Sequence, residues 1–213
     1  MNRCTSRLLT ASLAVLSLAL AVGVASANRL SVDDQDFLIA VTPVRFESGG
    51  LGRVECSVSL GGSFHSGSFA KVAGSLVGVI SQPTIDLPAC VGGTLSILVE
   101  ALPWHVRYQS FAGRLPAISS AGLNWVGISL VIRFAAFGVT CLGRTTEAEP
   151  LAVSLVINER GVVTSVPISE ASVIDLVDIG TGTLCDVGGA RWTIAGSGAM
   201  EDRARSSVTL SLI

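Results

Sequence analysis

Four residues with chemically versatile side chains lie close together in the middle of the sequence: Trp104, His105, Arg107 and Tyr108. They belong to the segment LPWHVRYQSFAGRLPAI, residues 102–118, in a chain whose aromatic content is only 5%. Aromatic, imidazole and guanidinium groups are enriched where proteins recognise ligands, so these four residues are a candidate binding surface. The alternative is a crossover between two halves of the chain whose aromatic side chains pack into the core, and we favour it.

Histidine chemistry would have to use His65 or His105, because the chain has 2 histidines. A hydrolase also needs a serine or cysteine nucleophile beside the base and a carboxylate that orients it. The sequence contains no GxSxG nucleophile elbow and no recognised setting for either histidine. A hydrolase that uses His105 or His65 therefore stays an alternative, and we expect no catalytic residue, no metal site and no cofactor.

The first 27 residues have the features of a secretory signal peptide. Arg3 and Arg7 precede an apolar stretch at 8–24, and the Ala-Ser-Ala sequence at 25–27 is the small-x-small pattern that signal peptidase cleaves. We therefore expect a secreted protein, located outside the cell or on the exterior of the cell envelope. No integral membrane span should remain after cleavage.

The charge balance excludes some classes of partner. The 14 basic residues include the two arginines of the expected signal peptide, which leaves 12 basic residues against 16 acidic ones, with no run of either sign. Nucleic-acid binding is disfavoured by this mildly negative balance. Charged residues make up 14% of the chain and its mean hydropathy is high, so we expect a folded protein with a large apolar interior.

Four of the 5 cysteines lie beyond the expected signal peptide: Cys56, Cys90, Cys141 and Cys185. An even number of cysteines in an exported protein predicts disulfides, and no CxxC pair suggests zinc or redox chemistry. Three pairings are open. We favour one bridge in each half of the chain, Cys56 with Cys90 and Cys141 with Cys185, each worth roughly 3 to 4 kcal/mol in the chain-entropy model.

Hydrophobic and polar residues alternate strictly in several windows. Examples are VECSVSL from Val54, ISLVIRF from Ile128, LAVSLVI from Leu151 and SVTLSLI at the C-terminus. This period of two predicts half-buried strands, and glycine-rich turns separate the windows. We therefore predict an all-β fold with antiparallel strands. A sandwich and a barrel give the same alternation, and both stay open.

The two halves of the chain echo each other in the order cysteine, hairpin, cysteine, double glycine, strand. The double glycines follow Cys90 and Cys185, where we expect tight turns or bulges. A true duplication and a chance echo both fit this pattern. We expect an N-terminal arm at 28–48 and a single β domain at 49–213, with halves at about 49–122 and 123–213.

The segment Leu102–Ile118 also supports a resemblance. Its pattern LPWHxRYxSFxGxLPxI, with CxGG at Cys90 and VxC at Cys141, resembles a group of uncharacterised exported bacterial β-rich proteins of about this length. The resemblance implies a secreted β-rich protein. It implies no activity, substrate or catalytic residue.

These features favour a non-catalytic protein that works by binding or by surface interaction. A second hypothesis is a carrier that holds a small apolar ligand inside a closed barrel. The hydrolase described above is the third.

Overall fold

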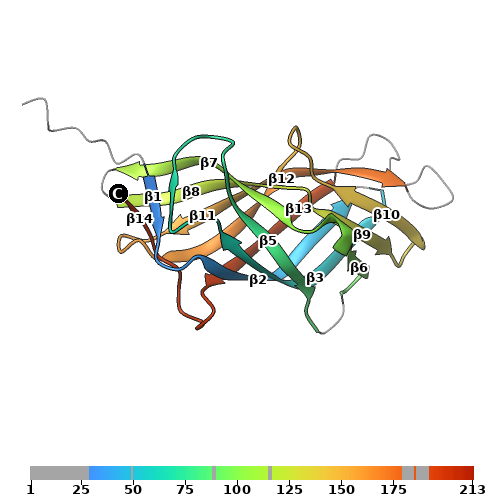
Figure 1. The fold of residues 1–213 in the computed structure, drawn as a ribbon. Helices are drawn as coiled ribbons and strands as arrows, with labels where there is room; N and C mark the ends of the chain where they lie inside the picture. Colours follow the sequence, from blue (N-terminus) through green and yellow to red (C-terminus); the bar gives the residue numbers. More distant parts are fainter. Residues whose placement is uncertain (1–28, 49, 88–89, 115–116, 179–184, 186–191) are drawn as a thin grey trace, which may run out of the picture.

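The computed structural model describes residues 29–213 except for 49, 88–89, 115–116, 179–184 and 186–191 (Figure 1). The expected signal peptide lies outside the described residues. The described part is an all-β fold with antiparallel pairing and one short 3-10 helix, η1 (Val99–Ala101). The strands are β1 (Arg29–Val32), β2 (Asp36–Ser48), β3 (Gly52–Phe64), β4 (Ser68–Ala70), β5 (Leu76–Ile85), β6 (Gly93–Ile97), β7 (Trp104–Arg114), β8 (Ala117–Val126), β9 (Ser129–Phe134), β10 (Val139–Arg144), β11 (Leu151–Ile157), β12 (Val163–Asp178), β13 (Trp192–Glu201) and β14 (Leu210–Leu212).

Eight of these strands close into a barrel. Their order is β11-β8-β7-β5-β3-β2-β13-β12, and a pairing between β12 and β11 completes the ring. The alternation seen in the sequence decides which side chains face inward: in β11, the residues from Leu151 to Ile157 are alternately buried and exposed. The prediction of an all-β antiparallel fold is confirmed, and of the two architectures left open the structure has the barrel.

Four long strands, β3, β2, β13 and β12, continue beyond the barrel and carry a second sheet. β12 pairs with β11 through Val163–Ile168 and with β10 through residues 175–178. Between these two parts, all three ladders among the four strands shift register, at Val41/Val44, Ala195/Gly198 and Ile168/Ser172. Bulges increase local bending and twist, so the shared wall turns here from the barrel toward β10, β9 and β6.

The strand order repeats itself. The sheet contains the series β5-β3-β2-β13, and the series β12-β10-β9-β6 follows it directly. In the second series, β12 corresponds to β5, β10 to β3 and β9 to β2. The fourth strand of each series comes from the other half of the chain, because β13 pairs with β2 and β6 pairs with β9. The echo in the sequence therefore corresponds to a repeated topology in which the two halves exchange their last strands.

Both disulfides join the predicted cysteines, Cys56 with Cys90 and Cys141 with Cys185. In the repeated topology the two bridges occupy equivalent places. One cysteine of each pair lies in the second strand of a series, β3 or β10, and the other lies before an exchanged strand, β6 or β13. Gly92, two residues after Cys90, has a φ of 84°, and a Cβ there would lie 2.1 Å from the Arg53 carbonyl oxygen, so the structure requires glycine at this turn.

A small sheet, β14-β1-β4, covers one end of the barrel (Figure 1). Its inward side chains include Leu30, Phe69 and Leu210, which are almost fully buried. Phe69 stacks on Phe64 of β3 at a centroid distance of 5.8 Å and lies 6.2 Å from the ring of Tyr108 in β7. The aromatic side chains therefore attach the covering sheet to the barrel wall.

We expected an N-terminal arm at 28–48, but the described residues of this segment contribute two strands to the fold instead. Residues 29–32 form β1 of the covering sheet, and β2 lies in the wall between β3 and β13. The physical reason is the alternation from Phe37 to Val41, which buries Phe37, Ile39 and Val41 inside the barrel.

Because the two disulfides occupy equivalent places, we expect them to stabilise the fold to a similar extent. They close loops with sequence separations of 34 and 44 residues, so the chain-entropy model gives each a contribution of about 4 kcal/mol. We expect the double variants Cys56→Ser/Cys90→Ser and Cys141→Ser/Cys185→Ser to lose similar free energies of unfolding, measured by urea titration. A loss confined to one bridge would show that the two halves do not depend equally on their crosslinks.

Candidate functional site

The four residues of the predicted binding surface lie on β7 but on opposite faces of the barrel wall. Trp104 and Tyr108 point inward and are each 3% exposed. His105 is exposed on the outside, and Arg107 lies half-buried there. Strand alternation separates the two pairs, so the four side chains do not line one pocket. The two aromatic residues have the core role that we favoured from the sequence.

Arg107 holds two connections against the outer wall. Its guanidinium donates to the Gly74 carbonyl oxygen at 2.9 Å and forms an ion pair with Glu147. The first contact ties the β4–β5 connection to β7, and the second ties the β10–β11 connection to it. Arg107 is therefore engaged in structural contacts on both sides.

The histidines have no catalytic setting within the described part of the chain. The side chains of His65 and His105 are exposed, and neither forms a hydrogen bond or an ion pair with another described residue. A triad needs a nucleophile and a carboxylate within hydrogen-bond reach of the base. The observed geometry gives the hydrolase hypothesis no support. The described residues also contain no group of three or more side chains suited to hold a metal ion.

The interior of the fold contains a small apolar cavity of about 40 Å³. It lies where the barrel meets the second sheet, and all of its lining residues are hydrophobic, among them Val44, Leu95, Trp104, Trp125 and Ile194. Ligand pockets for drug-sized molecules are roughly 300–1,000 Å³. Since this cavity is several times smaller, the carrier hypothesis requires the core to open.

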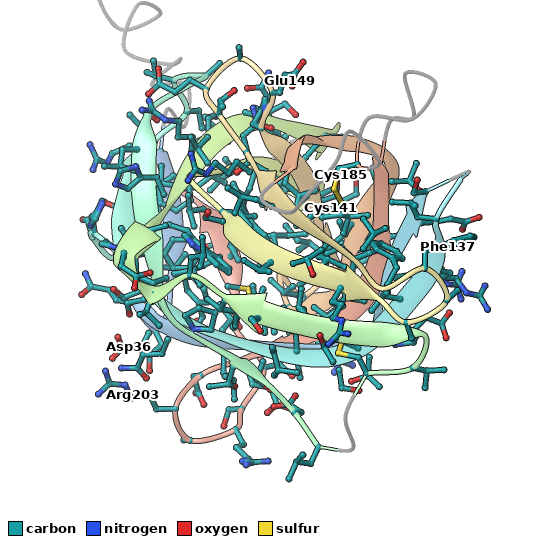
Figure 2. The ribbon with its side chains drawn as sticks, turned by 90° about the vertical axis from the view of Figure 1, so that its right-hand side faces the viewer. Asp36, Phe137, Cys141, Glu149, Cys185 and Arg203 are labelled. Atoms are coloured by element: carbon teal, nitrogen blue, oxygen red, sulfur yellow. A yellow bond between two sulfur atoms is a disulfide. The ribbon has the colours of Figure 1, made fainter. Side chains whose placement is uncertain are left out.

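An exposed aromatic side chain lies at the end of the molecule opposite the covering sheet (Figure 1). The turn between β9 and β10 has the sequence Ala135-Ala136-Phe137-Gly138, and the Phe137 side chain is 62% exposed. Figure 2 shows Phe137 at the edge of the molecule, pointing away from the core. The Ala135 N–H donates to the Gly92 carbonyl oxygen at 3.0 Å, which places the turn beside Val91, 71% exposed.

We call the surface made by Val91, Ala135, Ala136 and Phe137 the apolar tip. None of its four residues carries a polar side chain. Exposed apolar side chains that gather at one place on a folded protein can mark an interaction site. Neither Val91 nor Phe137 was selected from the sequence, although the segment FAAFGV between two alternating windows was a signal for an apolar hairpin turn.

Comparisons with known proteins identify no relative. No family model matches the sequence, and no curated protein matches it. Among solved structures, the fold is similar to that of DynF from the dynemicin biosynthesis pathway of Micromonospora chersina, with 9% identity over 86% of this chain and 82% of that chain, and a TM-score of 0.31. A likeness at this TM-score supports no conclusion about function.

Within the described residues, no helix has the length and apolar character needed to cross a bilayer.

The burial of Tyr108 leads to a prediction about pH. Burial removes water from the phenol and raises its pKa above the ordinary value of 10.0. Because the pKa is higher in the folded than in the unfolded chain, the stability that the neutral phenol contributes is complete below about pH 10 and is lost as the pH rises through the folded pKa.

Since the chain has 1 tyrosine, ultraviolet absorbance of the phenolate reports this group alone. We expect phenolate to form in the native protein at a higher pH than in the protein unfolded by urea. In the Tyr108→Phe variant the corresponding fall in stability at alkaline pH should disappear. Identical titration curves for the native and unfolded protein would contradict the assignment.

Proposed function

We propose that this protein is exported and works without catalysis, by surface interaction through the apolar tip. The observation that carries the proposal is the exposure of Phe137 at the end of a hairpin. Burying a phenylalanine side chain against a partner yields roughly 1.5–3 kcal/mol relative to leaving it in water. Aromatic residues of this kind are common anchors of protein interfaces.

Three further observations support the proposal. The apolar cavity found between the barrel and the second sheet is only about 40 Å³, too small for a drug-sized ligand. The exposed histidines have no side-chain partners among the described residues. The two disulfides fit an oxidising compartment outside the cytoplasm, where the predicted signal peptide would direct the chain.

The proposed partner is a protein with an apolar pocket that accepts Phe137. The matched control is Val72, which is 60% exposed on the β4–β5 connection and lies outside the apolar tip. A photo-crosslinking amino acid at position 137 should give one discrete crosslinked species in the exporting cell, and the same amino acid at position 72 should give none. The second change Val91→Ser should reduce the crosslink. Equal crosslinking at both positions would overturn the proposal.

Stability measurements separate an interaction role from a structural one. The Phe137 side chain contributes little to the core because it is mostly in water, so Phe137→Ser should change the free energy of unfolding by less than about 0.5 kcal/mol. A loss of several kcal/mol in urea titration would mean that Phe137 supports the fold, and the crosslinking result would then have another origin.

A further inference from the structure

A second surface feature is independent of the apolar tip: a polar groove of about 480 Å³ on the outside of the barrel. Its floor is the outer face of β2, β3 and β5, and its rim is the turn between β13 and β14. The volume falls within the range of ordinary ligand sites. The polar residues that line it are Asp36, Ser63, Ser81, Gln82, Asp202, Arg203 and Arg205.

The floor of the groove has little side-chain bulk because Gly61 and a bulge in the β3–β5 ladder lie there. Gly61 pairs with Gln82, whereas Gly62 pairs with Ile80, so Ser81 has no residue opposite it and is exposed. The Cβ that Gly62 lacks would point into the core, 2.3 Å from the Val79 carbonyl oxygen and 2.6 Å from the ring of Phe37, so packing beneath the groove requires glycine there. On the outer face, Gly61 has no side chain, and the backbone of β3 is open there next to hydroxyl and amide side chains.

The rim is held in place by a compact hydrogen-bonded turn. Asp202 and Ser206 exchange two hydrogen bonds of 2.8 Å, from the Asp202 N–H to the Ser206 carbonyl oxygen and from the Ser206 N–H to the Asp202 carboxylate. From this turn Arg203 reaches across the groove, and its Nε lies 2.9 Å from Oδ2 of Asp36. Figure 2 shows these two side chains facing each other.

The charges in the groove are balanced, and its neutral polar groups are available. Its two carboxylates, Asp36 and Asp202, match its two guanidinium groups, Arg203 and Arg205. Within the described chain, no protein group hydrogen-bonds the side chains of Ser63, Ser81 or Gln82.

A neutral site with both donors and acceptors matches hydroxyl groups, which donate and accept in the same way, better than it matches an ion. The adjacent carboxylate and guanidinium of Asp36 and Arg203 can respectively accept from and donate to two neighbouring hydroxyls.

We propose that this groove binds a neutral carbohydrate through its vicinal hydroxyl groups. Among the described residues that line the groove, the aromatic one is Phe37, which is buried beneath the floor and gives the sugar ring no stacking surface. Hydrogen bonds alone hold the ligand, and the dissociation constant for a short oligosaccharide is about 1 mM. Because no ion pair with the ligand forms, added salt leaves the affinity unchanged.

The test is a titration of the isotope-labelled full-length mature protein with maltotriose and with cellotriose, followed by the backbone amide signals in two-dimensional NMR. We expect at least one of these sugars to shift the signals of Gly61, Gly62 and Ser81, in low salt and in 1 M NaCl alike. Gln82→Ala should weaken binding about five-fold, the effect of one lost hydrogen bond. Gln109→Ala, a change of the same kind on the outside of β7, should leave binding unchanged.

Two results would overturn the inference. One is the absence of shifts in the groove with both sugars at concentrations well above the expected dissociation constant. The other is binding of glucuronate or of the dipeptide Gly-Gly, used as charged probes, that salt abolishes, which would identify an ionic site. Neither result affects the proposed role of the apolar tip, because the groove and Phe137 share no residue.

Discussion

The pairing of β2 with β13 joins the two halves of the chain, and both sheets depend on it. β2 opens the barrel domain and β13 comes near its end, yet their ladder runs from Glu47 paired with Thr193 to Leu38 paired with Glu201. One part of this ladder lies in the barrel wall and the other supports the second sheet. The register shift between Ala195 and Gly198 separates the two parts, so a single pair of strands sets the geometry on both sides of the bend.

The inner faces of the barrel wall are packed with apolar side chains, and both surfaces proposed for binding lie on the outside. Aliphatic and aromatic side chains from every wall meet inside, and the aromatic contacts of Phe64, Phe69 and Tyr108 close the end under the covering sheet. Eight-stranded barrels have an interior that side chains can fill completely or that can hold one small ligand. Here the apolar cavity beside the second sheet is about 40 Å³, and the outer groove at the β13–β14 turn is larger, at about 480 Å³.

The sequence was most informative where a feature depends on local order. Alternation predicted the strands, and the echo around Cys56, Cys90, Cys141 and Cys185 predicted the correct disulfides. Barrel closure was not predictable, because the pairing of β11 with β12 depends on the curvature that the sheet accumulates over all of its strands. β2 was missed because an acidic segment precedes it and Pro43, which cannot donate to a ladder, interrupts its alternation at the bulge. The groove joins residues as distant as Asp36 and Arg203, and no spacing rule connects them.

The exchanged last strands affect the order in which the chain can complete its fold. Synthesis delivers the N-terminus first, so β2 and β3 are available to pair long before residues 192–201 can cover the outer edge of β2. Until then, the edge presents unpaired backbone groups that can pair with any other extended chain. A nascent molecule therefore stays vulnerable to aggregation until almost its whole length has emerged, and passage through a secretion channel in an unfolded state would postpone that exposure to the moment of release.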